Sequence, residues 1–257
     1  MNDDYFESAR LTVINRDLSS GGIGTLGEKT LHAVVKQYLE PDPTKHEQKL
    51  GSFIVDIFDG ERVFEIQTRQ FRNLRAKLEA LLPEYPVTIV YPMQARKWLL
   101  WINPDSGELS SPRLSPKRGQ LCDVFRELYQ IKPFLQHPNL SLLILQIDLE
   151  EYRFLNGWSQ DRKRGSHRHN RLPLRLEHEL LVANPSDYRQ LIPENLSANF
   201  TSAEFAKAAH VSPTVARTTL NILLNLGHVS INGKKGRLRT YGQWCANDHN
   251  DHEVTQT

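Results

Sequence analysis

The chain has 257 residues, of which 39% are hydrophobic and 24% charged, and its net charge of +2 is too small to indicate a polyanionic partner by itself. No run approaches the ~20 apolar residues of a membrane span, the acidic start is not a secretory signal, and Cys122 and Cys245 lack CxxC spacing. We therefore expect a cytoplasmic protein without a membrane segment, a disulfide framework or a cysteine-based zinc site.

The first 160 residues predict one mixed α/β domain behind a polar segment. Residues 1–24 are polar and end in a Gly-rich stretch, which predicts a flexible N-terminal arm. Residues 27–40 carry apolar side chains at the spacing of an amphipathic helix. Strand-like runs, a helix over residues 71–82 and further strands follow. This order predicts a mixed sheet flanked by helices over residues 25–160.

Two strand-like runs meet at Asp59–Gly60, a dipeptide that favours a tight turn. A hairpin turning there would place Phe58 opposite Glu61 and Asp56 opposite Val63. Without a bulge this pairing fixes which side chains share a face, because side chains alternate along each strand.

Three polar side chains then share one face of the hairpin, namely Asp56, Glu65 and Gln67, with Glu65 diagonal to Asp56. Two carboxylates placed in this way can share one Mg²⁺, which prefers oxygen ligands. Both faces also carry apolar side chains, which predicts a sheet covered on both sides, where a carboxylate needs a partner or a metal. A solvated sheet face is the alternative interpretation.

A helix with Glu28 near its start precedes "VDI", "FEIQT" and a second helix. In this order and spacing, residues 25–92 resemble the core of the PD-(D/E)xK nuclease superfamily, which has the restriction-endonuclease-like fold. Asp56 matches the first acid of the motif and Glu65 matches the second. Gln67 stands where the lysine usually is.

The resemblance implies hydrolysis of phosphodiester bonds. Mg²⁺ held by Asp56 and Glu65 would polarise the phosphate and lower the pKa of a bound water. Gln67 would orient that water without acting as a base, and Glu28 would be a further ligand through water. Active and degenerate members both carry glutamine at the position of Gln67, so the resemblance leaves both outcomes open.

The C-terminal part of the chain holds most of its basic charge. Residues 161–241 carry 13 Lys and Arg against 6 Asp and Glu, a net charge of +7. Such a segment is an electrostatic footprint for a polyanion. We expect a basic linker over residues 161–184, a second domain over 185–242 and a disordered tail over 243–257.

The second domain is predicted to contain a helix, a turn, a second helix and a basic hairpin. Thr201 and Glu204 form a capping box, and Ser212 caps the next helix. In this arrangement the domain resembles the winged helix-turn-helix family, which implies DNA binding with the second helix in the major groove. The side chains expected to contact DNA are Thr214, Arg217, Thr218 and Asn221 on the helix and Lys234, Lys235, Arg237 and Arg239 on the hairpin.

The sequence therefore predicts a restriction-endonuclease-like α/β domain followed by a smaller C-terminal winged-helix domain. The first hypothesis is a Mg²⁺-dependent DNA nuclease of bacterial type. The alternative is a non-catalytic DNA-binding or regulatory protein with a degenerate nuclease fold, and a third hypothesis is a protein-interaction scaffold. DNA is the expected partner, a homodimer is left open, and no membrane is expected.

Overall fold

The computed structural model describes residues 3–19, 29–158 and 164–243. The chain divides into two compact units: unit 1 comprises Met1–Gly119 and His137–Ala183, and unit 2 comprises Gln120–Gln136 and Asn184–Thr257. The predicted disordered tail lies outside the described residues except for residue 243.

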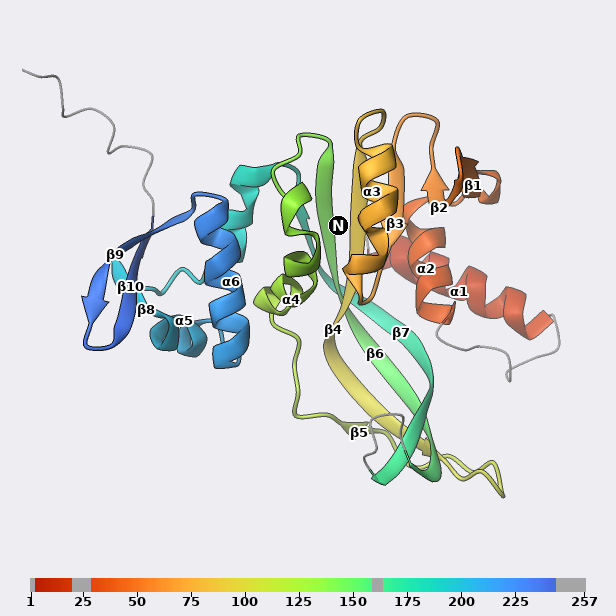
Figure 1. The fold of residues 1–257 in the computed structure, drawn as a ribbon. Helices are drawn as coiled ribbons and strands as arrows, with labels where there is room; N and C mark the ends of the chain where they lie inside the picture. The colour runs from red at the N-terminus through yellow and green to blue at the C-terminus, as the bar shows by residue number, and fades with distance from the viewer. Residues whose placement is uncertain (1–2, 20–28, 159–163, 244–257) are drawn as a thin grey trace, which may run out of the picture. The chain divides into compact units, whose positions relative to one another are not determined.

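Unit 1 is built on a mixed seven-stranded sheet (Figure 1). Its strands are β1 (His46–Leu50), β2 (Phe53–Phe58), β3 (Val63–Ile66), β4 (Val87–Ile102), β5 (Arg113–Leu114), β6 (Leu140–Trp158) and β7 (Arg164–Val182). They lie in the order β1-β2-β3-β4-β6-β7, with β5 paired to β4. β3, β4 and β6 run parallel, and the other pairs are antiparallel. This confirms the expected mixed α/β class.

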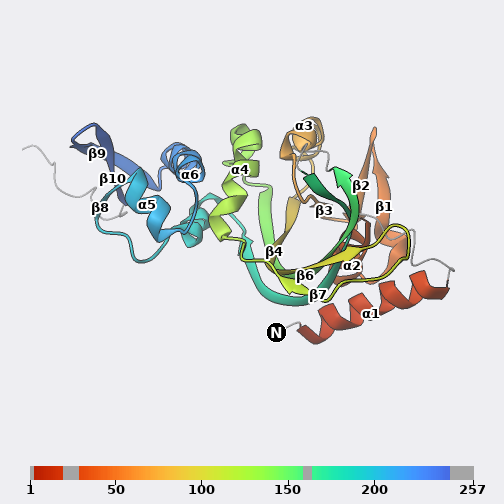
Figure 2. The same cartoon turned by 90° about the horizontal axis from the view of Figure 1, so that it is seen from below.

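Helices flank this sheet, and Figure 2 shows α1 and α3 on opposite sides of it. The helical segments of unit 1 are α1 (Asp3–Ser19), α2 (Lys29–Leu39), η1 (Pro43–Lys45), η2 (Phe71–Leu74) and α3 (Arg75–Leu81). One apolar core joins α1 and α2 to the strands, with Phe6, Val34, Ile57 and Ile147 all fully buried. This core fixes the position of α2, which carries part of the candidate site.

The prediction of a flexible arm over residues 1–24 is wrong for residues 3–19, because these form the helix α1. Phe6 and Val13 are seven residues apart and therefore lie on the same side of the helix, where both are buried. The sequence concealed this helix because its apolar stripe is short and set among many polar residues. The rest of the predicted arm lies outside the described residues.

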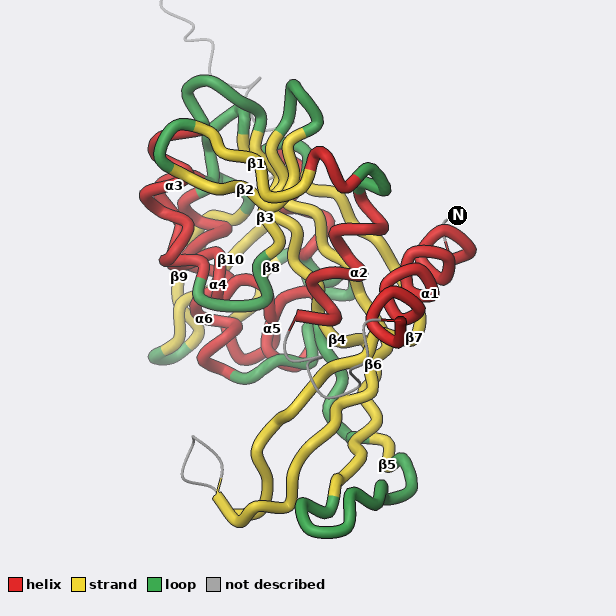
Figure 3. The backbone as a smooth tube through the Cα atoms, turned by 90° about the vertical axis from the view of Figure 1, so that its right-hand side faces the viewer, coloured by secondary structure: helices red, strands yellow, loops and turns green. Residues whose placement is uncertain are grey.

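The basic linker predicted over residues 161–184 is also wrong from residue 164 onwards. Those residues form β7, which pairs with β6 along its whole length, from Leu142↔Val182 to Trp158↔Arg164. Together with β4 and β5, the two strands extend away from the helices as a long twisted arm (Figure 3). β7 is rich in arginine and polar residues, a composition that also fits a basic loop. Its pairing with β6, which makes it a strand, could not be predicted from the sequence.

The β2–β3 hairpin differs in detail from its prediction. Phe58 pairs with Val63 rather than with Glu61. The loop is longer because the Asp59 carboxylate accepts hydrogen bonds from the backbone N–H groups of Glu61 and Arg62. The register therefore shifts by two residues, which changes the pairing but keeps the alternation of faces.

Unit 2 combines two separate segments of the chain. Its elements are η3 (Leu121–Val124), α4 (Phe125–Leu128), η4 (Tyr129–Phe134), η5 (Pro185–Leu191), β8 (Asn199–Thr201), α5 (Ser202–Ala208), α6 (Pro213–Asn225), β9 (Val229–Lys235) and β10 (Leu238–Gln243). The three strands form a small sheet in the order β8-β10-β9. The β9–β10 pair is the predicted basic hairpin.

The predicted domain boundaries, 25–160 and 185–242, fail at residues 120–136, which leave unit 1 and complete unit 2. α4 packs against α6, and Phe125 and Ile131 are fully buried. The Cys122 thiol also donates a hydrogen bond to the carbonyl of Leu191 at 3.0 Å. This segment supplies apolar surface that residues 185–242 lack, so unit 2 is discontinuous in sequence.

Candidate functional site

Asp56 lies directly before Ile57, the residue of β2 at which the pairing with β3 ends. Its carboxylate, instead of a backbone carbonyl of β2, accepts the next hydrogen bond from β3. Its Oδ2 accepts a hydrogen bond from the backbone N–H of Ile66 at 2.7 Å, and its Oδ1 lies 3.1 Å from Nε2 of His32 on α2. Burial raises the pKa of Asp56, but the hydrogen bond and charge of His32, the Ile66 N–H and Lys36 outweigh burial and lower it. Asp56 is therefore held as a carboxylate.

Glu65 has a different partner and a different environment. It is 4% exposed, and both of its oxygens accept hydrogen bonds from Nζ of Lys77 on α3, at 2.7 and 2.8 Å. The same ammonium donates to the carbonyl of Ile54 at 2.7 Å. Burial raises the pKa of Glu65 to about 7, with Asp56 adding to the rise and Lys77 opposing it. Glu65 is thus part of a buried ion pair.

The two carboxylates predicted to share a metal are therefore engaged by different elements. Asp56 is bound by α2 and by a strand end, whereas Glu65 is bound by α3. Within the described residues, no three His, Cys, Asp or Glu side chains are placed to hold a metal ion. The arrangement does not fit the expected Mg²⁺ site, because all four carboxylate oxygens already have protein partners.

The other predicted site residues add nothing to a metal centre in this arrangement. The Gln67 amide turns away and donates a hydrogen bond to the carbonyl of Arg69 at 2.5 Å. Its backbone N–H donates to the carbonyl of Val90. Glu28, the remaining expected ligand, lies outside the described residues.

An open cleft of about 730 Å³ lies between α1, α2, β1 and β2, and Asp56 is on its wall. The polar side chains that line it are Arg16, His32, Lys36, Gln37, His46, Glu47 and Asp56. Nζ of Lys36 donates to Glu47 at 2.5 Å, and Lys36 lowers the pKa of Glu47. The cleft thus holds two carboxylates side by side, each with a partner on α2: Asp56 beside His32 and Glu47 beside Lys36.

The sequence prediction missed Lys77, His32 and Lys36. His32 and Lys36 are four residues apart on a predicted helix, a spacing that places two side chains on one face. That spacing was a usable signal for the cleft. Lys77 offered none, because its contact with Glu65 depends on how α3 packs on the sheet.

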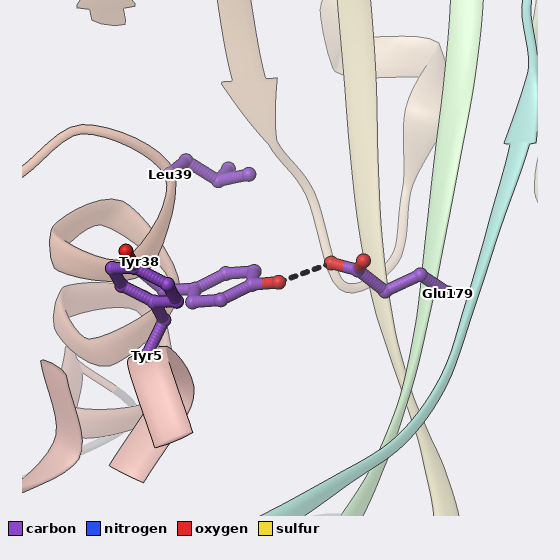
Figure 4. Close-up of a pocket in the computed structure, with 4 residues that line it drawn as sticks. All are labelled: Tyr5, Tyr38, Leu39 and Glu179. Atoms are coloured by element: carbon purple, nitrogen blue, oxygen red, sulfur yellow. Dashed lines mark hydrogen bonds between the residues drawn. The ribbon is translucent and has the colours of Figure 1, made fainter. Parts of the chain in front are cut away.

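A smaller pocket of about 380 Å³ is lined by Tyr5, Tyr38, Leu39 and Glu179 (Figure 4). The Tyr38 hydroxyl donates a hydrogen bond to Oε1 of Glu179 at 2.5 Å. This contact joins α2 to β7 and supports the core beneath it. Glu179 supplies the one carboxylate among the residues that line this pocket. The pocket therefore offers fewer groups for binding or catalysis than the cleft.

Unit 2 brings the residues expected to contact DNA to two neighbouring surfaces. On α6, Thr214, Arg217 and Asn221 are exposed, whereas Val215, Leu220 and Leu223 on the other side are fully buried. On the hairpin, all four expected cations are exposed: Lys234, Lys235, Arg237 and Arg239.

Two contacts limit the freedom of these side chains. Nζ of Lys132 donates to Oδ1 of Asn221 at 2.9 Å, so the Asn221 side chain already has a partner in the segment formed by residues 120–136. Lys235 lies 3.2 Å from Glu204, but both side chains are exposed and such pairs are weak. Arg217 and the remaining hairpin cations carry the positive charge of this surface.

Comparison with known proteins gives a family but no activity. A family model described as a domain of unknown function, DUF8091, matches residues 29–183, and its end coincides with the last residue of unit 1. An uncharacterized protein of Treponema pallidum (strain Nichols) is 28% identical over 221 residues, covering 85% of this chain and 86% of that protein. No solved structure matches the chain significantly. None of the described helices is long and apolar enough to cross a membrane.

Proposed function

The chain belongs to the DUF8091 family, and from its own residues we propose that it is a non-catalytic DNA-binding protein. Unit 2 would act as a winged helix-turn-helix module, with α6 in the major groove and the β9–β10 hairpin as the wing. The observation that carries this proposal is the division of α6 into a fully buried apolar side and an exposed side bearing Arg217, beside a hairpin with four exposed cations.

The chemistry of these groups suits DNA. Threonine and arginine side chains on the exposed side of α6 can hydrogen-bond base edges in a major groove that accommodates a helix. Lysines and arginines on the hairpin can neutralise phosphates, and this releases counterions and makes binding depend on salt. The rigid core beneath α6 would hold the reading side chains in place.

DNA binding can be tested by fluorescence anisotropy with a labelled duplex. Arg217→Ala should weaken binding about tenfold, the loss typical of one base or phosphate contact. Lys234→Ala with Lys235→Ala should weaken binding less at high salt than at low salt. Lys49→Ala on β1 of unit 1 also removes a cation and serves as the control. Equal binding by all variants would count against the proposal.

A Mg²⁺-dependent nuclease with a restriction-endonuclease-like core is the second candidate. Two observations favour it: the order α2, β1, β2, β3, α3, β4 follows that fold, and Asp56 lines an open cleft beside cations. Metal binding by both acids would require the displacement of Lys77 and His32. For that reason a degenerate nuclease fold agrees better with the geometry.

Plasmid cleavage separates the two candidates. Wild type and Asp56→Ala would be incubated with supercoiled plasmid and Mg²⁺, and the products separated on an agarose gel. The non-catalytic proposal expects no cleavage by either protein. Cleavage by wild type that disappears in Asp56→Ala would establish the nuclease instead.

A further inference from the structure

The segment formed by residues 120–136 brings a lysine to the exposed side of α6. Lys132 lies on η4, which packs against α6, and its Nζ donates a hydrogen bond to Oδ1 of Asn221 at 2.9 Å. A second hydrogen bond joins the same two elements of unit 2, from Nε2 of Gln136 to the carbonyl of Asn225 at 2.8 Å. The packing of unit 2 therefore holds Lys132 beside Asn221.

The contact with Lys132 fixes the orientation of the Asn221 side-chain amide. An ammonium group has three donors and no acceptor, so the atom that faces it is the amide oxygen. The Nδ2 group of Asn221 is left to donate elsewhere, and it donates to no protein atom within the described residues. In the same part of the chain Lys132 pairs with no carboxylate, so its positive charge is not neutralised.

Arg217 adds further donors on the same side of α6. It precedes Asn221 by four residues, a spacing that places two side chains on one face of a helix, and both residues are exposed. A guanidinium group has five donors and no acceptor, and no group in the described part of the chain binds that of Arg217. We call Lys132, Arg217 and Asn221 the donor cluster, because the groups that they offer to a ligand are mainly donors.

The donor cluster matches guanine better than adenine. In the major groove, guanine presents two acceptors, N7 and O6, whereas adenine presents the N7 acceptor beside the N6 donor. An unrestrained asparagine pairs with adenine, through Oδ1 to N6 and Nδ2 to N7. In this structure Oδ1 of Asn221 already accepts from Lys132. The ammonium repels the partial positive charge of an adenine N6 amino group and attracts guanine O6.

We infer that Lys132 sets the base preference of unit 2, so that α6 reads guanine in the major groove. The inference rests on the function proposed for unit 2 and names the base that this surface selects. Asn221 donates to N7 and Lys132 to O6 of one guanine. Arg217 binds a second, nearby guanine through two hydrogen bonds to N7 and O6, the commonest specific contact of arginine with DNA.

Selection from a random DNA pool tests the inference. The full chain would be incubated with duplexes that carry a randomised central region, and the bound duplexes would be sequenced. We expect guanine to be enriched at two nearby positions. Replacement of either G·C pair by A·T should then weaken binding about tenfold in fluorescence anisotropy, a loss in the range of one wrong base pair.

Inosine makes the test specific for the major groove. It keeps the N7 and O6 acceptors of guanine and lacks only the N2 amino group, which lies in the minor groove. A duplex with inosine opposite cytosine at both positions should therefore bind as well as the guanine duplex. Weakening by inosine equal to that by adenine would show that the preference is not read at N7 and O6, and would overturn the inference.

Three variants assign the preference to Lys132. Lys132→Met removes the ammonium, keeps a side chain of similar length and frees Asn221 for adenine, so the preference for guanine over adenine should fall from about tenfold to about one at one position. Lys132→Arg keeps a donor and should keep most of the preference. Lys207→Met removes an exposed lysine of α5 and should leave the preference unchanged. A thermal melt of each variant shows whether the fold is retained.

The outcomes distinguish this inference from the proposed function. A selected pool without enriched guanine, or a guanine preference that Lys132→Met leaves unchanged, overturns the inference even if Arg217→Ala still weakens binding. Loss of the preference at one position in Lys132→Met and at the other in Arg217→Ala supports it. Binding that is equal for all duplexes and for wild type and Arg217→Ala overturns the proposed function and this inference together.

Discussion

The contact between Lys77 and Glu65 could not be predicted from local patterns in the sequence. The helix predicted over residues 71–82 carries apolar side chains at helical spacing, and three of them, Phe71, Leu74 and Leu78, are buried. The stripe fixes which side of α3 meets the sheet, but not which strand residue lies under each polar side chain. The partner of Glu65 is therefore a property of packing that no spacing in the sequence encodes.

The Glu65–Lys77 pair predicts a stability change that depends on pH. The folded pKa of Glu65, about 7, is above its ordinary value of 4.5. Protonation therefore favours the folded state, and the contribution is full below the unfolded pKa and is lost as pH rises through 7. Lys77→Met removes the ammonium that opposes this loss, so the folded state should suffer most at alkaline pH.

We expect Lys77→Met to lower the free energy of unfolding by about 3 kcal/mol at pH 8, the range for breaking a buried pair, and by clearly less at pH 5.5. Urea unfolding followed by circular dichroism at both pH values measures this difference. Lys49→Met, an exposed lysine on β1, is the control. An equal loss at both pH values would show that the ionisation of Glu65 is not involved.

The hairpin illustrates which part of a register the sequence determines. The expected pairing was wrong because the Asp59 carboxylate binds the N–H groups of Glu61 and Arg62 and widens the loop. The shift is an even number of residues, so the alternation along each strand is kept. Burial of Val55 and Ile57 on β2 follows from that alternation. The alternation can be predicted from the residues of one strand alone, whereas the pairing cannot.

Among whole elements, α5 and α6 were the most predictable, because the signals at their ends are local in sequence. The Thr201 side chain accepts a hydrogen bond from the Glu204 N–H, and the Glu204 carboxylate accepts one from the Thr201 N–H. Ser212 caps α6 through the N–H of Val215. β7 was missed because a strand is defined by a distant partner, here β6.

Removal of the α5 cap should cost a measurable part of the stability of unit 2. Thr201→Ala leaves the Glu204 N–H without its acceptor, and we expect a loss of about 1 kcal/mol in the free energy of unfolding. Thermal or urea unfolding of the full chain would show it. Ser202→Ala, one residue further along, removes a hydroxyl without touching the capping box. A comparable loss in both variants would mean that the cap is not the cause.

The division of the whole chain into units was the least predictable feature, because boundaries placed from local sequence patterns assume that each domain is one continuous segment, whereas unit 2 is made of two. The mixed α/β class followed from the order of strand and helix signals. The departure of residues 120–136 from unit 1 did not, because their apolar pattern fits a helix on either unit. Only the completed core, with Phe125 and Leu128 buried in unit 2, decides where they belong.

If residues 120–136 complete unit 2, a cavity made there should loosen α6, although residues 137–212 separate the two along the chain. Phe125 is fully buried and Tyr129 is 51% exposed, so the two aromatic residues form a matched pair. Phe125→Ala should cost about 3–5 kcal/mol and accelerate hydrogen–deuterium exchange of the α6 amides, measured by mass spectrometry. Tyr129→Ala should leave that exchange near wild type. Unchanged α6 protection in Phe125→Ala would contradict a core shared between the two segments and would restore a continuous C-terminal domain.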